Sequence, residues 1–141
     1  AYKRLPSIER LSCNLTCKIN SHHLVWCKKR LDELEGNGSV LNPIWYAGSF
    51  AIGAIFGRFG EKVSLGFVEE TEKQVVAHLD RHLDKISPKD KETIEILKTM
   101  KEDEDLHARQ AVDKGSEELK IPVKKIMQFT AKMMTSTSKY I

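Results

Sequence analysis

Apolar residues recur along most of this chain at intervals of three and four positions, which is the period of an α-helix that buries one face. One such stripe contains Val68, Val75, Leu79, Leu83 and Ile86, and a second contains Leu97, Met100, Glu104, Ala108 and Ala111. Residues at this spacing share one side of a helix. We find no β-type alternation of useful length, so the pattern predicts an all-α helix bundle.

Turn-forming residues divide the chain into five predicted helices. The first ends at the Gly-Asn-Gly sequence of residues 36–38, and a short apolar helix follows from Asn42, as N-cap, to about residue 56, before the Gly57–Gly60 break. A long helix covers about 61–86, and the next starts at the Ser-Pro-Lys-Asp sequence 87–90 and closes at Gly115. The last runs from Pro122 towards Tyr140. We expect one domain over residues 1–141.

Glu104 and His107 are the most informative residues of the fourth predicted helix. They are three positions apart, so they lie on the same side of the helix, at or beside its core-facing stripe. An ionised carboxylate that faces a core destabilises the fold unless a partner compensates its charge. A metal ion compensates it, and inward Glu-x-x-His pairs form the di-iron sites of ferritin-like bundles.

Glu72 lies inside the apolar stripe of the preceding helix, between Val68 and Val75. Its neighbours Glu69 and Glu70 are also acidic, and a cluster of acids is usually a solvated face. Considered alone, Glu72 is therefore ambiguous. Together with the inward Glu104 and His107, we expect it to be a metal ligand.

Two further side chains near these positions, those of His78 and Asp103, allow two interpretations each. His78 is either a histidine at the edge of the core or a proton relay close to the site, because imidazole titrates near neutral pH. His82 is assigned to the solvent side. Asp103 either orients a metal-bound histidine of another helix through its ring N–H or is an exposed acid in an acidic run, and the sequence alone slightly favours the exposed acid.

The histidines and cysteines near the amino terminus suggest two kinds of metal site. His23 would complete a second Glu-x-x-His pair, but Asn20 occupies the glutamate position, and an amide is a poor iron ligand. Zinc is disfavoured, because the spacing of the candidate ligands matches no standard pattern. Those candidates are Cys13, Cys17, His22, His23 and Cys27. We expect the cysteines to be buried free thiols.

The composition indicates which classes of protein the chain can belong to. The chain has 141 residues, 30% of them charged and 40% hydrophobic, with a net charge of +3 and a pI near 8.7. Three cysteines favour a reducing compartment, and no run reaches the roughly 18 apolar residues that span a bilayer. No signal peptide is visible, and a start at Ala1 is expected of a processed or partial product. The lysine-rich tail lacks arginine, so no nucleic-acid partner is expected.

Two segments have the composition of surfaces that contact a membrane. Residues 45–57 are apolar all round, and we expect the aromatic side chains Trp45, Tyr46, Phe50 and Phe56 to face membrane or substrate. The last helix sets apolar residues against lysines, as in helices that lie on anionic membranes. A buried short helix and a packed last helix with a solvated lysine face remain the alternatives.

These motifs resemble those of the bacterial demethoxyubiquinone hydroxylases, a family of ferritin-like di-iron monooxygenases of ubiquinone biosynthesis. The resemblance covers Leu41 to Ile141. It rests on the stretches Leu41–Phe50, Val63–Val68, Thr71–Val75 with His78-Leu79, Asp103–His107 and Ala131–Thr135, together with His23–Cys27. The run around Trp45 and the order of the later motifs make it specific, whereas Glu-x-x-His alone is weak evidence.

The resemblance implies a ferritin-like fold and an oxygen-dependent activity. It places iron ligands at Glu72, Glu104, His107 and His23, with Glu104 bridging two irons, and a functional histidine at His78. Dioxygen would hydroxylate the ring of a prenylated demethoxyubiquinol, with reducing equivalents from outside. The enzyme would sit peripherally on the cytoplasmic face of the inner membrane, alongside other ubiquinone-biosynthesis proteins.

The amino-terminal part departs from the family pattern. The family's first helix, with one ligand glutamate, has no counterpart, and Asn20 replaces a second glutamate. Residues 1–22 are therefore atypical, and the predicted fold is a ferritin-like bundle lacking its first helix. Two functions stay open at this point: a hydroxylase impaired by missing ligands, or a non-enzymatic module that binds a prenylated quinone or the membrane surface.

Overall fold

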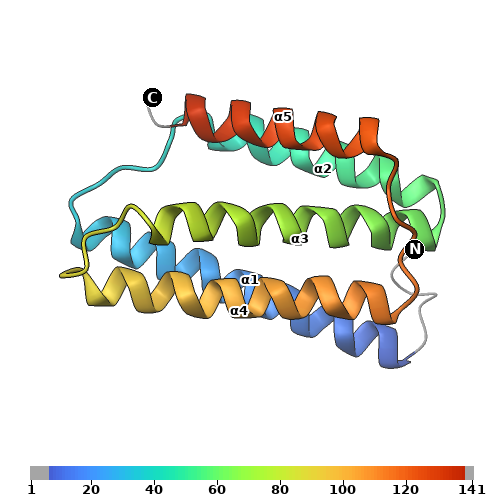
Figure 1. The fold of residues 1–141 in the computed structure, drawn as a ribbon, viewed down its shortest axis with the longest axis horizontal. Coiled ribbons are helices and arrows are strands. Elements are labelled where there is room, and N and C mark those ends of the chain that lie inside the picture. Colours follow the sequence, from blue (N-terminus) through green and yellow to red (C-terminus); the bar gives the residue numbers. More distant parts are fainter. Residues whose placement is uncertain (1–6, 139–141) are drawn as a thin grey trace. The chain divides into compact units, whose positions relative to one another are not determined.

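The computed structural model describes the backbone of residues 7–138 and the side chains of residues 18–138 (Figure 1). The helices in this range are α1 (Ser7–Glu33), α2 (Asn42–Arg58), α3 (Glu61–Leu83), α4 (Lys91–Asp113) and α5 (Ile121–Thr137). None of the described residues forms a β-strand, so the all-α prediction is confirmed. The chain divides into two compact units, residues 1–37 and 38–141, and a single domain over 1–141 stays a prediction.

The first unit contains α1, a helix of 27 residues. Arg30 donates to Glu33 across one helical turn, at 2.9 Å. The backbone N–H of Gly36 donates to the carbonyl of Leu31 at 2.8 Å, and Glu35 adopts a left-handed φ of 55°. This turn ends the helix close to the predicted Gly36–Gly38 break.

The second unit is built on the pair of α3 and α4, which lie side by side (Figure 1). Each has 23 residues and is therefore about 35 Å long. The buried apolar residues of the pair are Leu79, Ala108 and Ala111, and the two alanines let the helices approach closely. Lys101 of α4 donates to Asp80 of α3, which adds a polar link between the helices.

Local capping sets the ends of α4. Asp90 is its N-cap and accepts a hydrogen bond from the backbone N–H of Thr93 at 3.1 Å, so Ser87 and Pro88 belong to the preceding turn. At the other end Gly115 has a φ of 87°, a conformation that glycine adopts without strain, and it closes the helix as predicted. The preceding α3 ends at Leu83 instead of residue 86.

The short helix α2 packs against α3. The rings of Phe56 and Phe67 are stacked, with centroids 4.3 Å apart. The prediction of Asn42 as N-cap is wrong by one residue: Leu41 is the N-cap, and its carbonyl accepts from the N–H groups of residues 44 and 45 at 3.0 Å. The helix also continues through Gly57 to residue 58, and the chain turns at Gly60, whose φ is 99°.

The helix α5 is tied to α3 by the connection that precedes it. The backbone N–H of Glu117 donates to the carbonyl of Lys62 at 3.0 Å, and a Cβ atom on Gly66 would lie 2.0 Å from the Glu117 carbonyl oxygen. Neither α2 nor α5 has a buried residue. Within the described residues, no helix is long and apolar enough to cross a membrane.

Candidate metal centre

The pairing of α3 with α4 brings Glu72 next to Glu104 and His107. One carboxylate oxygen of each glutamate and one ring nitrogen of the histidine all lie within 4.8 Å of one another. Glu104 and His107 are 7% and 4% exposed, and Glu72 is half-buried. The three residues are the only group of this kind that the described part of the chain contains. The sequence prediction that they turn inward together is therefore supported by the geometry.

The hydrogen bonding of His107 leaves one ring nitrogen for a ligand. Its Nδ1 lies 3.2 Å from Oε2 of Glu104. When the carboxylate is ionised it can only accept, so Nδ1 carries the proton and Nε2 presents a lone pair. Among the described residues, this buried Nε2 has no hydrogen-bond partner. A buried polar atom of this kind is uncommon, and a metal ion would satisfy it.

The surroundings of Glu72 favour the protonated, neutral form of its carboxyl group. Burial, followed by the hydrogen bond and the charge repulsion from Glu104, raises its pKa from 4.5 to about 9. Two carboxylates at this distance cannot both stay ionised without a compensating cation, so the pair shares a proton when no cation is present. A divalent ion replaces that proton and favours both charges.

The donor set fits iron. Carboxylate oxygen together with imidazole nitrogen is the ligand combination of non-haem iron sites, and helix bundles build di-iron sites from inward Glu and Glu-x-x-His residues. The orphaned Nε2 of His107 and the raised pKa of Glu72 are what a site for a positive ion requires. These observations support a metal site.

The remaining predicted site residues lie outside this group. His78 is half-buried on α3, where its ring is 4.4 Å from that of His82, so His82 is not fully on the solvent side. Asp103 is half-buried on α4 beside Glu104. His23 lies on α1 in the first unit, with its ring 5.5 Å from that of Trp26. The functional roles of these residues stay predictions.

The structure describes the side chain of only one of the three cysteines. Cys27 is exposed, so the expectation of buried thiols is wrong for this residue. The side chains of Cys13 and Cys17 lie outside the described residues. The same holds for Tyr140, towards which the last helix was predicted to run.

The aromatic side chains of α2 face in different directions. Tyr46 and Phe50 are 77% and 72% exposed, as expected of residues that meet membrane or substrate. Phe56 is half-buried and stacks on Phe67, so it is turned towards α3. Trp45 is also half-buried, and its indole Nε1 is a buried donor without a partner among the described residues.

Sequence reasoning missed a polar cluster on the other side of α3. Glu70 is 8% exposed, accepts from Gln74 at 2.8 Å, and lies 3.6 Å from Nζ of Lys124 on α5. Glu69 accepts from Ser116 of the connection between α4 and α5. The run of three acids suggested a solvated face, and the only contrary signal was Gly66, one turn before Glu70 and small enough for close packing.

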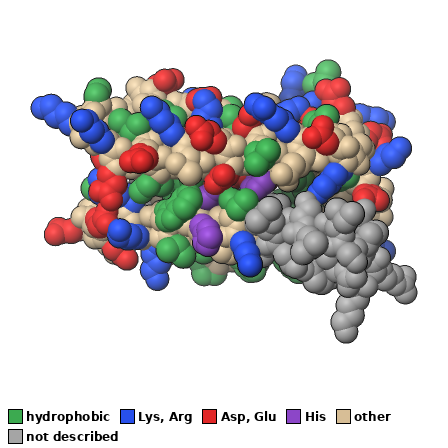
Figure 2. All heavy atoms as spheres, turned by 90° about the horizontal axis from the view of Figure 1, so that it is seen from below, with side chains coloured by type: hydrophobic (Ala, Val, Ile, Leu, Met, Phe, Trp, Pro, Cys, Tyr) green, Lys and Arg blue, Asp and Glu red, His purple; other side chains and the backbone are tan. Residues whose placement is uncertain are grey.

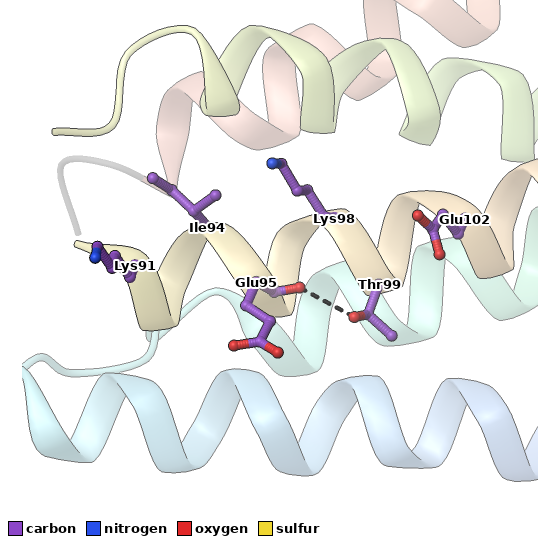
Figure 3. A pocket seen from close by; sticks show the side chains of 6 residues that line it. All are labelled: Lys91, Ile94, Glu95, Lys98, Thr99 and Glu102. Carbon is purple, nitrogen blue, oxygen red and sulfur yellow. Dashed lines mark hydrogen bonds between the residues drawn. The ribbon is translucent and has the colours of Figure 1, made fainter. Parts of the chain in front are cut away.

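A shallow depression of about 390 Å³ runs along α4, and its lining residues are Lys91, Ile94, Glu95, Lys98, Thr99 and Glu102 (Figure 3). It does not include the three metal-ligand candidates. On the face drawn in Figure 2, acidic and basic side chains are intermingled with hydrophobic ones.

Comparison with known proteins identifies relatives. The family described as ubiquinone biosynthesis protein COQ7 matches residues 12–138. A 3-demethoxyubiquinol 3-hydroxylase of Legionella pneumophila is 55% identical over 119 residues, which cover 84% of this chain and 56% of that protein. The protein of the same name from Nitrosococcus oceani is 48% identical over 138 residues, covering 98% of this chain and 64% of the relative. The chain thus spans less than two thirds of these relatives. No solved structure was found to match it.

Proposed function

Because the chain belongs to the family of ubiquinone biosynthesis protein COQ7, we propose that it takes part in hydroxylating the ring of a demethoxyubiquinol. Its relatives carry the name 3-demethoxyubiquinol 3-hydroxylase. We propose further that Glu72, Glu104 and His107 bind iron for this reaction. The observation that carries the proposal is the convergence of two carboxyl groups and an unpartnered imidazole nitrogen between α3 and α4.

The reaction inserts one oxygen atom of O₂ into a ring C–H bond and releases the other as water. Two electrons and two protons from an external reductant balance it. Bound iron would supply the activation of dioxygen. The contribution of this chain is to hold the ion: Glu104 accepts a hydrogen bond from Nδ1–H of His107 and thereby orients the ring, and Glu72 supplies a second carboxylate from α3.

A two-iron site needs more ligands than these three. In helix bundles such a site uses about six protein side chains, four of them carboxylates. We propose His23 as a further ligand, Asp103 as the group that orients a histidine, and His78 as the residue that moves a proton. The relatives are longer than this chain, which leaves room in them for the remaining glutamates.

The exposed apolar side chains suggest where a prenylated substrate is met. On α2, Tyr46 and Phe50 are largely exposed, and on α5 so are Ile126 and Phe129, at 65% and 70%. Exposed aromatic and aliphatic side chains on a helix surface favour the interface of a bilayer. We propose peripheral attachment to the cytoplasmic face of the inner membrane, where other ubiquinone-biosynthesis proteins would be neighbours.

The decisive experiment measures iron and product on the same preparation. The chain is reconstituted anaerobically with ferrous ion, iron per chain is determined, and a short-tailed demethoxyubiquinol is then supplied with reductant and O₂. We expect bound iron and a product heavier by one oxygen atom. Glu104→Gln should lose both, whereas Glu102→Gln, an exposed acid on the same helix, should lose neither.

One outcome would reject the hydroxylase proposal, and another would reject the proposed iron ligands. A chain that binds no iron but retains a quinone analogue would be a non-enzymatic quinone-binding module. A chain in which Glu104→Gln binds iron as well as the unchanged protein would place the metal elsewhere.

A further inference from the structure

We propose that the exposed face of α4 pairs with the same face of a second copy of this chain, with the two helices antiparallel. The shallow depression along α4 is lined by Lys91, Ile94, Glu95, Lys98, Thr99 and Glu102 (Figure 3). All of these residues are exposed except Ile94, which is half-buried. Four of the six carry a charge, so the arrangement of those charges decides which partner this face fits.

The charges of this face alternate in sign along the helix. Lys91, Glu95, Lys98 and Glu102 follow one another at intervals of four, three and four positions, which keeps them on one stripe within about 60° around α4. The signs run basic, acidic, basic, acidic. The first and last residues are 11 positions apart, so the stripe is about 17 Å long.

These four charges are not paired within the described part of the chain. No ion pair between described residues includes any of them, whereas Lys101 and Arg109 of the same helix pair with Asp80 and Asp105. In both i, i+4 pairs of the stripe the lysine precedes the acid, and this order stabilises a helix less than the reverse order. The four side chains are therefore available to charges of another molecule.

The stripe is complementary to itself when it is reversed. In a dimer with two-fold symmetry, residue i of one copy meets residue j of the other, and j meets i. When the axis passes between Glu95 and Lys98, Glu95 faces the partner's Lys98 and Lys91 faces the partner's Glu102. Every charge of the stripe then meets its opposite in both copies. A parallel arrangement in register would instead place like charges together, which is unfavourable.

The stripe lies on the side of α4 that is turned away from the proposed metal ligands. Glu104 follows Glu102 by two residues, which is a rotation of about 200° around the helix. Glu104 and His107 are buried, whereas the stripe is exposed. Pairing of two copies should therefore leave iron binding unchanged, and the inference does not rest on the proposed function.

The dimer should be weak and sensitive to salt. A helix face about 17 Å long buries less than the roughly 1,600 Å² of a standard interface, and exposed ion pairs contribute little each. The distance over which exposed charges attract falls from about 30 Å at 0.01 M ionic strength to about 3 Å at 1 M. The dimer should therefore form at low salt and dissociate at high salt.

Sedimentation velocity of the full chain, over a concentration series at low and high salt, tests the proposal. Lys98→Glu places two acids opposite each other at two points of the dimer and should weaken it at least about tenfold. The same change at Lys125, an exposed lysine on α5, should leave the dimer unchanged. The double variant Glu95→Lys, Lys98→Glu exchanges the two charges and should restore the dimer, because opposite charges face each other again.

Three outcomes would overturn the proposal. The first is a chain that stays monomeric at every concentration at low salt. The second is a dimer that high salt does not dissociate, and the third is a dimer that Lys98→Glu leaves intact, since either would use another surface. Circular dichroism confirms that each variant is folded, and the salt series on the unchanged protein decides the result without any variant.

Discussion

Replacing Glu72 by glutamine should stabilise the metal-free protein while abolishing metal binding. In the fold the pKa of Glu72 is raised from 4.5 to about 9, first by burial and then by Glu104. The folded state therefore holds a proton that the unfolded state releases, and stability that is complete below pH 4.5 is lost progressively as the pH rises towards 9. Glutamine is neutral at every pH and avoids this loss.

The size of the effect follows from the same values. One pKa unit corresponds to about 1.4 kcal/mol, so at pH 7, which is 2.5 units above 4.5, keeping Glu72 in the folded state costs about 3.5 kcal/mol at most, and partial solvation of Glu72 reduces this cost. We expect Glu72→Gln to raise the free energy of unfolding by about 1 to 3 kcal/mol at pH 7. The gain should fall to about 0.4 kcal/mol at pH 4.5, where the unfolded state is half protonated, and vanish below that pH.

Urea unfolding of the metal-free protein between pH 4.5 and 8 measures this difference, with Glu102→Gln as the exposed control on α4. Adding ferrous ion should reverse the order, because a ligand at about 100 times its Kd adds roughly 2.7 kcal/mol to a protein that binds it. A Glu72→Gln variant that is less stable at every pH would refute the reasoning. A gain that stays the same from pH 8 to pH 4.5 would show that its origin is packing and not charge.

Two further substitutions test the attachment of α5. Gly66→Ala should destabilise the protein by about 1 to 3 kcal/mol, because overpacking against the backbone of the α4–α5 connection outweighs a helix-propensity gain of about 1 kcal/mol. The control Gly48→Ala lies in open space on α2 and should stabilise the protein. Thermal unfolding compares them, and equal shifts would contradict the contact. Lys124→Met should lower the urea midpoint of unfolding, because it leaves Glu70 without its cation. The same change at the exposed neighbour, Lys125→Met, should not lower it. Similar midpoints for the two variants would show that the ion pair does not stabilise the fold.

Local sequence signals predicted the helices well and their ends less well. Periodicity and the turn at Gly115 placed α3 and α4 within a few residues, because these features depend on neighbours in the chain. The start of α2 was one residue off, since Leu41 accepts the first helical hydrogen bonds through its backbone carbonyl without help from its side chain. Capping through the backbone alone leaves no side-chain signature.

The sequence predicted the part of the site that lies on one helix. Its prediction was incomplete for contacts that join two helices. Glu104 and His107 share a face of α4, so their spacing was sufficient. The approach of Glu72 followed only from the assumption that two apolar stripes pack together. The pair between Glu70 and Lys124 could not be foreseen, because residues 54 positions apart meet only after α5 has folded back onto α3.

The acidic run of α3 shows why composition misled the sequence analysis. Glu70 and Glu72 are two residues apart, which turns them by about 200° around the helix, so one faces the lysine of α5 and the other the carboxylate of α4. Each is buried, at least in part, against a different neighbour and therefore meets a different charge. Glu70 has its cation in the chain itself, whereas Glu72 meets a second acid. Through Glu70, α3 thus contacts α5. The same helix holds Glu72 in a position where only a proton or a metal ion can neutralise its charge.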